Sequence, residues 1–421
     1  MRRWPVLLVA LAGLTCIHRD AVIVVNSRPS GAAIWLDGDH TEFVTPHTFT
    51  GVYAGMHWLK VAFDDCYWED TFTVSPKETR TFEPEIAQRI WIAENSLGIT
   101  APPAIAPDGT ICVVTNNSEL LGYDQSGNQR SNRPLPFSDA SAVAIGEDGR
   151  VYVKYSSSLL ALNPQGESLW SCPVAGGGGI ALGRNGVVYS SGGAELDACD
   201  SQGVALWSCP LGSSWRISAP VVGTDGTVYV ANSSGLHAVD SSGTNYWTAP
   251  LDYGGDDPLA LGADGTIYVT GYSLSAFAPD GNMRWMFTSS GNHYITEGAT
   301  VGPDGTIYAC VGDTLFAVNP DGTRRRGSYL PGDGQIMPVI SDDGRIYMAC
   351  DNPMLAAFDA DGKLLWRVSG SWVKSHPVLA DSMLLVIDSH RMLAAYRVSG
   401  TGPAQGWPMF QHDARRSGRA Q

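Results

Sequence analysis

The nine histidines are the first residues to consider for chemistry, because two of them at helical spacing with a nearby glutamate would hold a zinc ion. They form no His-x-x-x-His or His-Glu-x-x-His pattern. No Gly-x-Ser-x-Gly nucleophile motif and no phosphate-binding loop is present either, since the glycine run at 175–186 lacks the lysine of such a loop and a following helix. We therefore expect no catalytic residue and no nucleotide site.

Acidic turns are the second candidate chemistry, since calcium is held by several carboxylate and carbonyl oxygens at close spacing. The segments "SDDGR" (341–345) and "DADGK" (359–363) carry two acids each and no downstream glutamate that could bind with both oxygens. Aspartate followed by glycine is also the ordinary chemistry of a tight turn. The sequence predicts turns at these places and no metal site.

The cysteines form no Cys-x-x-Cys pair and have no histidine at metal-ligand spacing. Cys172 and Cys209 recur in "LWSCP", which indicates equivalent buried positions. We expect small buried hydrophobic roles for the cysteines after Cys16, rather than zinc ligands or a disulfide framework. They are Cys66, Cys112, Cys172, Cys199, Cys209, Cys310 and Cys350.

The charge balance excludes one class of partner. The chain has 42 acidic and 27 basic residues and a formal net charge of −15. A nucleic-acid backbone would be repelled by most of such a surface. The two basic clusters, at 324–326 and in the tail at Arg415, Arg416 and Arg419, are interpreted as solvated charge.

The N-terminus has the features of an export signal. Arg2 and Arg3 precede an apolar run from Val6 to Leu14, far short of the ~20 residues that span a bilayer. With Thr15-Cys16 after it, the segment 1–16 resembles a bacterial lipoprotein signal. That resemblance implies lipidation of Cys16 and a periplasmic or cell-surface location, and the alternative is an ordinary secretory signal.

A repeat of fixed period occupies most of the chain. Asp-Gly or Asn-Gly turns recur every 37 to 40 residues from Asp108-Gly109 to Asp343-Gly344. Each precedes a strand such as "TVYV", and a second glycine turn follows with a tryptophan four residues later. These tryptophans are Trp170, Trp207, Trp247, Trp285 and Trp366, while Ser131 and Arg326 replace them in two repeats.

Four strands in about forty residues are the signature of a propeller blade, because one such sheet cannot cover both of its faces and neighbours must do so. The predicted fold is all-β: an eight-bladed β-propeller, with seven blades as the alternative. The eighth repeat (375–398) lacks its last strand. We expect residues 88–95, with Trp91, to supply it and close the ring, and the six tryptophans to fill the gaps between sheets.

These motifs over residues 88–400 resemble the PQQ-like, or quinoprotein-type, β-propeller family. Some members are quinone-dependent dehydrogenases, but their adjacent cysteine pair is absent here and their calcium ligands cannot be placed. Because these features of the dehydrogenases are missing, we expect a propeller without a cofactor. The tail (401–421), with "GWPMFQHDARRSG", resembles segments that accompany such propellers and is expected to pack on the ring through Trp407, Met409 and Phe410.

Residues 21–84 have a sequence pattern different from that of the repeats. Val22 and Val24, then 33–36, 58–62 and 71–74, predict short antiparallel strands with one buried face. The segment resembles the PEGA domain, a small β-sandwich whose Pro-Glu-Gly-Ala motif stands here as Pro29-Ser30-Gly31-Ala32. The likeness implies an extracytoplasmic accessory module without catalytic residues.

Polar residues directly before the first strands of several blades would gather at one mouth of the central channel. They are Arg216, Asp256, Asp257, Glu297, Gln335 and Lys374. They are interpreted either as a binding ring or as the solvated rim of any propeller. The function predicted is a non-catalytic, exported envelope protein with a rigid protein-binding propeller. A glycan- or surface-layer-binding protein and a PQQ-dependent dehydrogenase are the alternatives.

Overall fold

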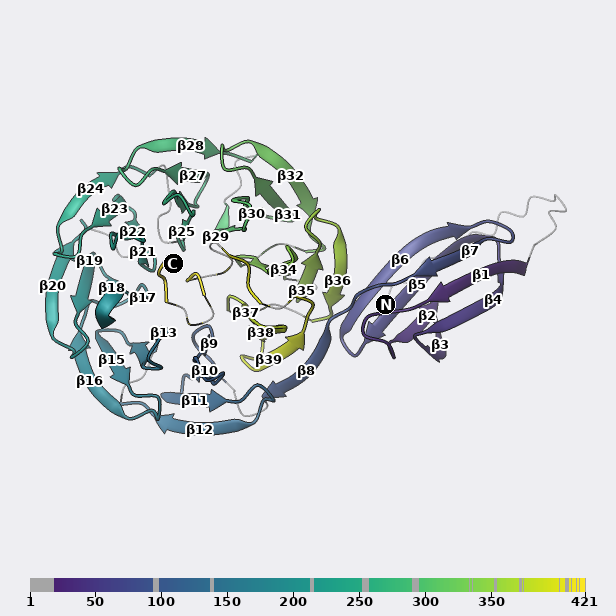
Figure 1. The fold of residues 1–421 in the computed structure, drawn as a ribbon, viewed down its shortest axis with the longest axis horizontal. Helices are drawn as coiled ribbons and strands as arrows, with labels where there is room; N and C mark the ends of the chain where they lie inside the picture. Colours follow the sequence, from purple (N-terminus) through teal and green to yellow (C-terminus); the bar gives the residue numbers. More distant parts are fainter. Residues whose placement is uncertain are drawn as a thin grey trace. The chain divides into compact units, whose positions relative to one another are not determined.

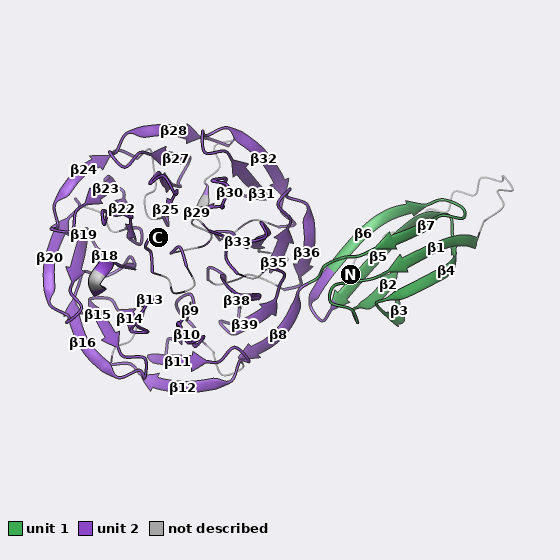
Figure 2. Cartoon of the chain, in the orientation of Figure 1, with its two compact units in different colours: residues 1–62, 68–86 green, residues 63–67, 87–421 purple. Residues whose placement is uncertain are grey.

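The computed structural model divides the chain into two compact units, residues 1–62 with 68–86 (unit 1) and residues 63–67 with 87–421 (unit 2) (Figure 2). It describes residues 19–93, 98–136, 140–212, 216–251, 257–289, 295–332, 334, 336–351, 354–370, 373, 375–400, 402–405, 409, 411–413, 415 and 417–420. These residues form strands and one 3-10 turn, η1 (Arg184–Gly186). Within these ranges no helix has the length and apolar character needed to span a membrane.

Unit 1 contains two sheets. One has the order β4-β1-β7 and the other contains β3-β2-β5-β6. Alternate residues of β1 are buried, including Ala21, Ile23 and Val25, as a strand with one core-facing side requires. The bounds are β1 (Arg19–Val25), β2 (Ala33–Leu36), β3 (Asp39–Val44), β4 (His47–Tyr53), β5 (Gly55–Phe63), β6 (Cys66–Val74) and β7 (Thr79–Phe82).

The expectation of purely antiparallel strands in unit 1 is wrong in one place. Strands β1 and β7 pair in parallel, with Val22 opposite Thr79 and Val25 opposite Phe82. Periodicity within a strand reports which side chains are buried but not the direction of the neighbouring strand. The direction therefore had to come from the structure.

Unit 2 is a ring of four-stranded antiparallel sheets, each with its first strand toward the centre and its last strand on the rim (Figure 1). The first four sheets contain β9 (Ala104–Ile105), β10 (Ile111–Val114), β11 (Glu119–Tyr123) and β12 (Gln129–Pro134); β13 (Ala142–Ile145), β14 (Val151–Lys154), β15 (Ser158–Leu162) and β16 (Ser168–Pro173); β17 (Ile180–Leu182), β18 (Val188–Gly192), β19 (Glu195–Cys199) and β20 (Ala205–Pro210); and β21 (Val221–Val222), β22 (Val228–Asn232), β23 (Gly235–Val239) and β24 (Asn245–Ala249).

The later sheets repeat this plan. They contain β25 (Ala260–Leu261), β26 (Ile267–Val269), β27 (Leu274–Phe277) and β28 (Met283–Phe287); β29 (Thr296–Val301), β30 (Ile307–Val311), β31 (Thr314–Val318) and β32 (Arg324–Tyr329); β33 (Val339–Ile340), β34 (Ile346–Ala349), β35 (Leu355–Phe358) and β36 (Leu364–Val368); and β37 (Val378–Ala380), β38 (Met383–Ile387), β39 (Leu393–Arg397) and β8 (Gln88–Ala93). The repeats are thus an all-β, propeller-like fold, as predicted.

The ring closes through β8, the first strand of the repeat region in the sequence. It pairs antiparallel with β39, where Ala395 lies opposite Trp91 and Leu393 opposite Ala93. The prediction that this segment completes the last sheet is confirmed for residues 88–93. Closure gives the final sheet the fourth strand that its own repeat lacks.

Tryptophans on the rim link most of the sheets to the next one. Trp207 donates its indole N–H to the carbonyl oxygen of Ser241 at 3.0 Å, in the second turn of the following sheet. A Cβ added at Gly243 of that turn would lie 2.7 Å from the Trp207 ring. Equivalent bonds are Trp91 to Gln125, Trp170 to Ser201, Trp247 to Pro279 and Trp285 to Pro320. Trp366 is also buried, at 1% exposure.

In the repeat without a tryptophan at 131, a different residue makes this link. Ser131 pairs with Gly122 at the tryptophan's register position, as Trp170 does with Ala161. The side chain that reaches the next sheet is that of Arg133, whose Nε donates to the Gln165 carbonyl oxygen at 3.1 Å. Arg133 lies two residues along the strand and so on the same face, and its length covers the extra distance.

The expectation that all the later cysteines are simple buried hydrophobes is wrong for two of them. Cys172 in β16 and Cys199 in β19 form a disulfide between neighbouring sheets, across 27 residues of sequence. The free cysteines among the described residues, Cys66, Cys112, Cys209, Cys310 and Cys350, are all buried. Cys209 occupies the position of Cys172 one sheet later, in a core cluster with Val239, which replaces Cys199 there.

Reducing this disulfide is expected to lower the free energy of unfolding by about 3.5 kcal/mol, because a loop of roughly 27 residues then becomes unrestrained in the unfolded chain. Urea unfolding with and without dithiothreitol measures the effect. The control is Cys172→Ala, whose stability should not respond to the reductant. An equal loss in both proteins would show that the reductant acts elsewhere.

Candidate functional site

A cavity of about 270 Å³ lies where the inner strands of several sheets begin. We call it the channel cavity. Its walls are mostly apolar, with Val143, Ile180 and Ile217 from three consecutive sheets, and Pro258 from a fourth. His376 and Gln411 add polar groups. An apolar cavity with a few polar groups at its edge is the common form of a binding site.

Two of the predicted channel-mouth residues are direct sequence neighbours of residues that line this cavity. Arg216, which is exposed, directly precedes Ile217, and the half-buried Asp257 directly precedes Pro258. The Asp257 carboxylate accepts a hydrogen bond from Thr270 Oγ1 at 3.2 Å. Glu297 lies in β29. The other predicted residues, Asp256, Gln335 and Lys374, lie outside the described residues, as do Cys16, Trp407 and Phe410.

Gln411 of the tail was missed in the sequence. Its side chain is buried at 5% exposure and lines the channel cavity, and its Oε1 finds no donor among the described residues. A buried amide oxygen without a donor is costly. The only sequence signal for it is the polar "QHD" directly after the apolar "WPMF", which gives no position in the ring.

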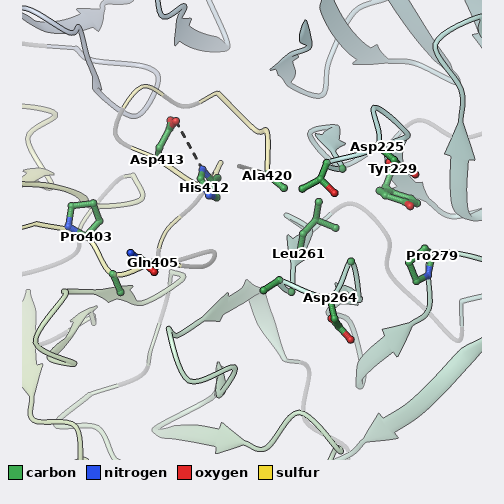
Figure 3. A pocket seen from close by; sticks show the side chains of 16 residues that line it. Asp225, Tyr229, Leu261, Asp264, Pro279, Pro403, Gln405, His412, Asp413 and Ala420 are labelled. Carbon is green, nitrogen blue, oxygen red and sulfur yellow. Dashed lines mark ion pairs between the residues drawn. The ribbon is translucent and has the colours of Figure 1, made fainter.

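A second and larger cavity, about 710 Å³, lies between the tail and the inner ends of two sheets (Figure 3). We call it the tail pocket. Its lining comes from the turns at 223–225 and 261–265 and from tail residues 403–405, 412–413 and Ala420. His412 Nδ1 lies 3.9 Å from the Asp413 carboxylate. Burial alone would raise the pKa of Asp413, but the neighbouring His412 ring and the hydrogen bond from the Ser417 amide lower it, so this carboxylate is ionised at neutral pH.

The residues present do not fit a quinone–calcium site. Across the described part of the chain, no three histidine, cysteine, aspartate or glutamate side chains gather in a way that could hold a metal ion. The disulfide found among the described residues joins two sheets rather than neighbours in sequence. These side chains therefore support no catalytic step through a quinone.

The match to a protein family decides the identity of the repeats. A family model described as outer membrane protein assembly factor BamB matches residues 193–335 and 311–407, together just over half of the chain. The chain belongs to this PQQ-like repeat family. The ring of unit 2 is accordingly a PQQ-like β-propeller. No curated protein matches the chain in sequence.

Solved structures agree with this fold. BamB from Moraxella catarrhalis superposes with a TM-score of 0.60 at 15% identity, covering 74% of this chain and 99% of that one. The computationally designed protein Ika8 gives 0.63 at 14% identity, with 74% and 100% covered. The C-terminal WD40 domain of Sif2 gives 0.57 at 13% identity, with 75% and 99% covered. At such identities these likenesses show the fold alone.

Proposed function

We propose that this BamB-family chain is a non-catalytic, exported envelope protein whose eight-bladed propeller is a rigid platform for binding another protein. Unit 1 would be a PEGA-type accessory module, and Cys16 would carry a lipid anchor. The channel cavity is the observation that carries the proposal. It is apolar, it has a buried amide oxygen at Gln411 that lacks a donor among the described residues, and its size suits one side chain of a partner.

Three further observations support this proposal. The matching family is described as an assembly factor for outer membrane proteins, and such a factor works on other proteins. The channel cavity is smaller than the roughly 300–1,000 Å³ of typical cofactor sites, whereas a single anchoring side chain in a tight pocket is a usual feature of protein interfaces. The Cys172–Cys199 disulfide is typical of an oxidising compartment outside the cytoplasm.

Photo-crosslinking in intact cells tests the proposal. A photoreactive amino acid at Arg216 or Asp257 is expected to capture a partner polypeptide, and the same group at Asp108, an exposed turn residue of another repeat, is the matched control. Mass spectrometry identifies the product. Capture that is equal at Asp108, or absent at both mouth positions, would reject the channel mouth as a protein-binding surface.

Export and anchoring are checked in the same cells with labelled palmitate, which should enter the natural chain and not Cys16→Ser.

A glycan partner is the second candidate, and its support lies in unit 1. There Phe43, 48% exposed, stacks on His47 with ring centroids 3.8 Å apart. Retention on isolated cell-wall polysaccharide that is lost in Phe43→Ala, without a crosslinked polypeptide, would favour the glycan.

A further inference from the structure

The first strand of each sheet uses only half of its backbone groups within the sheet. In β21, Val221 pairs with Tyr229, and the Gly223 amide donates to the Thr227 carbonyl oxygen at 2.9 Å. In an antiparallel pair such bonded positions alternate with positions whose N–H and C=O point away from the partner strand. Val222 is such a position, so its backbone groups face away from β22.

The tail of the chain forms hydrogen bonds with backbone groups that face away from the sheet. The Val222 amide donates to the Gly418 carbonyl oxygen at 2.8 Å, and the Ala420 amide donates back to the Val222 carbonyl oxygen at 2.9 Å. The equivalent residues of the two preceding sheets make the donor half of this pattern: the Leu182 amide donates to the Ser417 carbonyl oxygen at 2.8 Å and the Ile145 amide to the Arg415 carbonyl oxygen at 2.9 Å. The tail therefore makes backbone hydrogen bonds to the innermost strands of three consecutive sheets, with a parallel bridge at Val222.

Leu261 is the equivalent residue in the next sheet of the ring. Ala260 pairs with Tyr268, and the Gly262 amide donates to the Thr266 carbonyl oxygen at 2.8 Å. The backbone groups of Leu261 must therefore face away from β26, as those of Val222 face away from β22. Leu261 lines the tail pocket, and Figure 3 places it near Ala420. Among the described tail residues, none makes a hydrogen bond to Leu261.

The charge of the pocket favours a basic partner group. In the sheets β25–β28 and β29–β32, the aspartate of the first turn forms an ion pair with an arginine that directly precedes the tryptophan position. Asp264 pairs with Arg284, and Asp304 pairs with Arg325 at 2.7 Å. In the sheet of Asp225 that position is Tyr246. Asp225 is exposed, lines the tail pocket and has no ion-pair partner among the described residues.

We propose that the tail pocket binds an extended peptide segment with a basic side chain, by strand addition to Leu261 and an ion pair with Asp225. The peptide continues around the ring the pattern that the tail begins at Ile145, Leu182 and Val222. Strand addition is an established mode of peptide recognition, in which backbone bonds give affinity and side-chain pockets give specificity. The inference rests on the proposed protein-binding function and gives it a second site and a partner chemistry.

The binding test uses a fluorescein-labelled synthetic peptide of alternating valine and arginine, titrated with the purified full chain and followed by fluorescence anisotropy. The same peptide with glutamate in place of arginine is its control. We expect saturable binding of the arginine peptide and at least tenfold weaker binding of the glutamate peptide. No saturable binding, or equal binding of both peptides, would overturn the proposal.

Two variants and one control locate the site. Asp225→Asn keeps the turn but removes the charge, and should weaken binding about fivefold, as expected for an exposed ion pair. Ala263→Trp, at an exposed position of the pocket wall, should block it. Asp108→Asn is the matched control, because the Asp108 carboxylate accepts the same turn bond, from the Thr110 amide at 2.9 Å. An equal loss in Asp108→Asn would place the effect outside the pocket.

Hydrogen exchange gives a readout that a general loss of stability cannot imitate. With the arginine peptide bound, the Leu261 amide should exchange more slowly, while the Val222 amide, already bonded to the tail, should not change. Binding without protection at Leu261 would contradict strand addition. The proposed function fails separately, since crosslinking at Arg216 and Asp257 can succeed whatever happens at the tail pocket.

Discussion

Replacing Gly243 with alanine is expected to lower the free energy of unfolding by about 2–5 kcal/mol. Gly243 has φ +85°, which costs an L-residue about 1–2 kcal/mol. The added Cβ would also lie 2.7 Å from the Trp207 ring, and overpacking of this kind costs about 1–3 kcal/mol. The substitution thus strains the contact that joins two neighbouring sheets. Urea unfolding measures the loss.

Gly226 provides the matched control for this prediction. Its φ is +89°, nearly that of Gly243, but an added Cβ would meet nothing within 4 Å. Gly226→Ala should therefore cost only the backbone part. In a Trp207→Ala background Gly243→Ala should likewise lose its steric part, so the two changes should be less than additive. Equal costs for both glycines in the natural background would refute the role of the tryptophan contact.

The repeat explains why so much of the ring is predictable from sequence. Its turns, strands and tryptophans are set by neighbours within a few residues, and seven similar copies make the pattern clear. The same regularity predicts the pairing of β8 with β39, because one repeat lacks a last strand and one spare strand precedes the first repeat. Local chemistry together with a count of strands is sufficient there.

Contacts between sheets are less predictable, because they depend on distances that no local pattern encodes. Cys172 pairs with Cys199 rather than with a cysteine of its own motif, and "LWSCP" at Cys209 is the same motif without a disulfide. Arg133 replaces a tryptophan from two residues further along the strand. In both cases the partner is fixed by the packing of neighbouring sheets.

The candidate sites also divide into a part that local sequence predicts and a part that depends on how distant segments pack. The positions before the first strands led to the neighbourhood of the channel cavity, because strand starts meet at one end of a propeller. Gln411 and the tail pocket could not be found in this way, since they depend on the path of the tail, whose described residues belong to no helix or named strand. The backbone bonds of the tail to Ile145, Leu182 and Val222 reveal that path.

Lys154 should make the stability of the ring depend on pH. Its side chain is fully buried, and its Nζ donates to Ser190 Oγ at 2.6 Å, to the Ser191 carbonyl oxygen at 2.5 Å and to the Ala175 carbonyl oxygen at 3.0 Å. Burial lowers the pKa of this lysine to about 7, against a smaller opposing effect of Asp197. The bonds to Ser190 and Ser191 join β14 to β18 of the next sheet, and the third reaches the connection between β16 and β17, so the titration of this group affects a contact between sheets.

The direction in which the free energy of unfolding changes with pH follows from the number of protons that each state binds. In the unfolded chain a lysine keeps its proton to a pH near 10.4, whereas the folded chain releases it near 7. Above pH 7 the unfolded state therefore binds more protons, and the free energy of unfolding rises with pH. Between pH 7 and 8.5 the contribution of Lys154 to the free energy of unfolding should rise by about 1.6 kcal/mol. Free thiols of the unfolded chain, with a usual pKa of about 8.5, begin to ionise in this range and act in the opposite direction, because burial raises the pKa of the thiols in the folded chain.

Lys154→Met should remove this rise, whatever its effect on overall stability, because it has no proton to release. Subtracting its unfolding free energies from those of the natural chain at each pH isolates the contribution of Lys154. Lys363→Met, at an exposed lysine, is the control and should keep the full slope. A difference curve that is flat from pH 7 to 8.5 would mean that Lys154 stays protonated in the fold. Its three acceptors would then outweigh burial in the folded state.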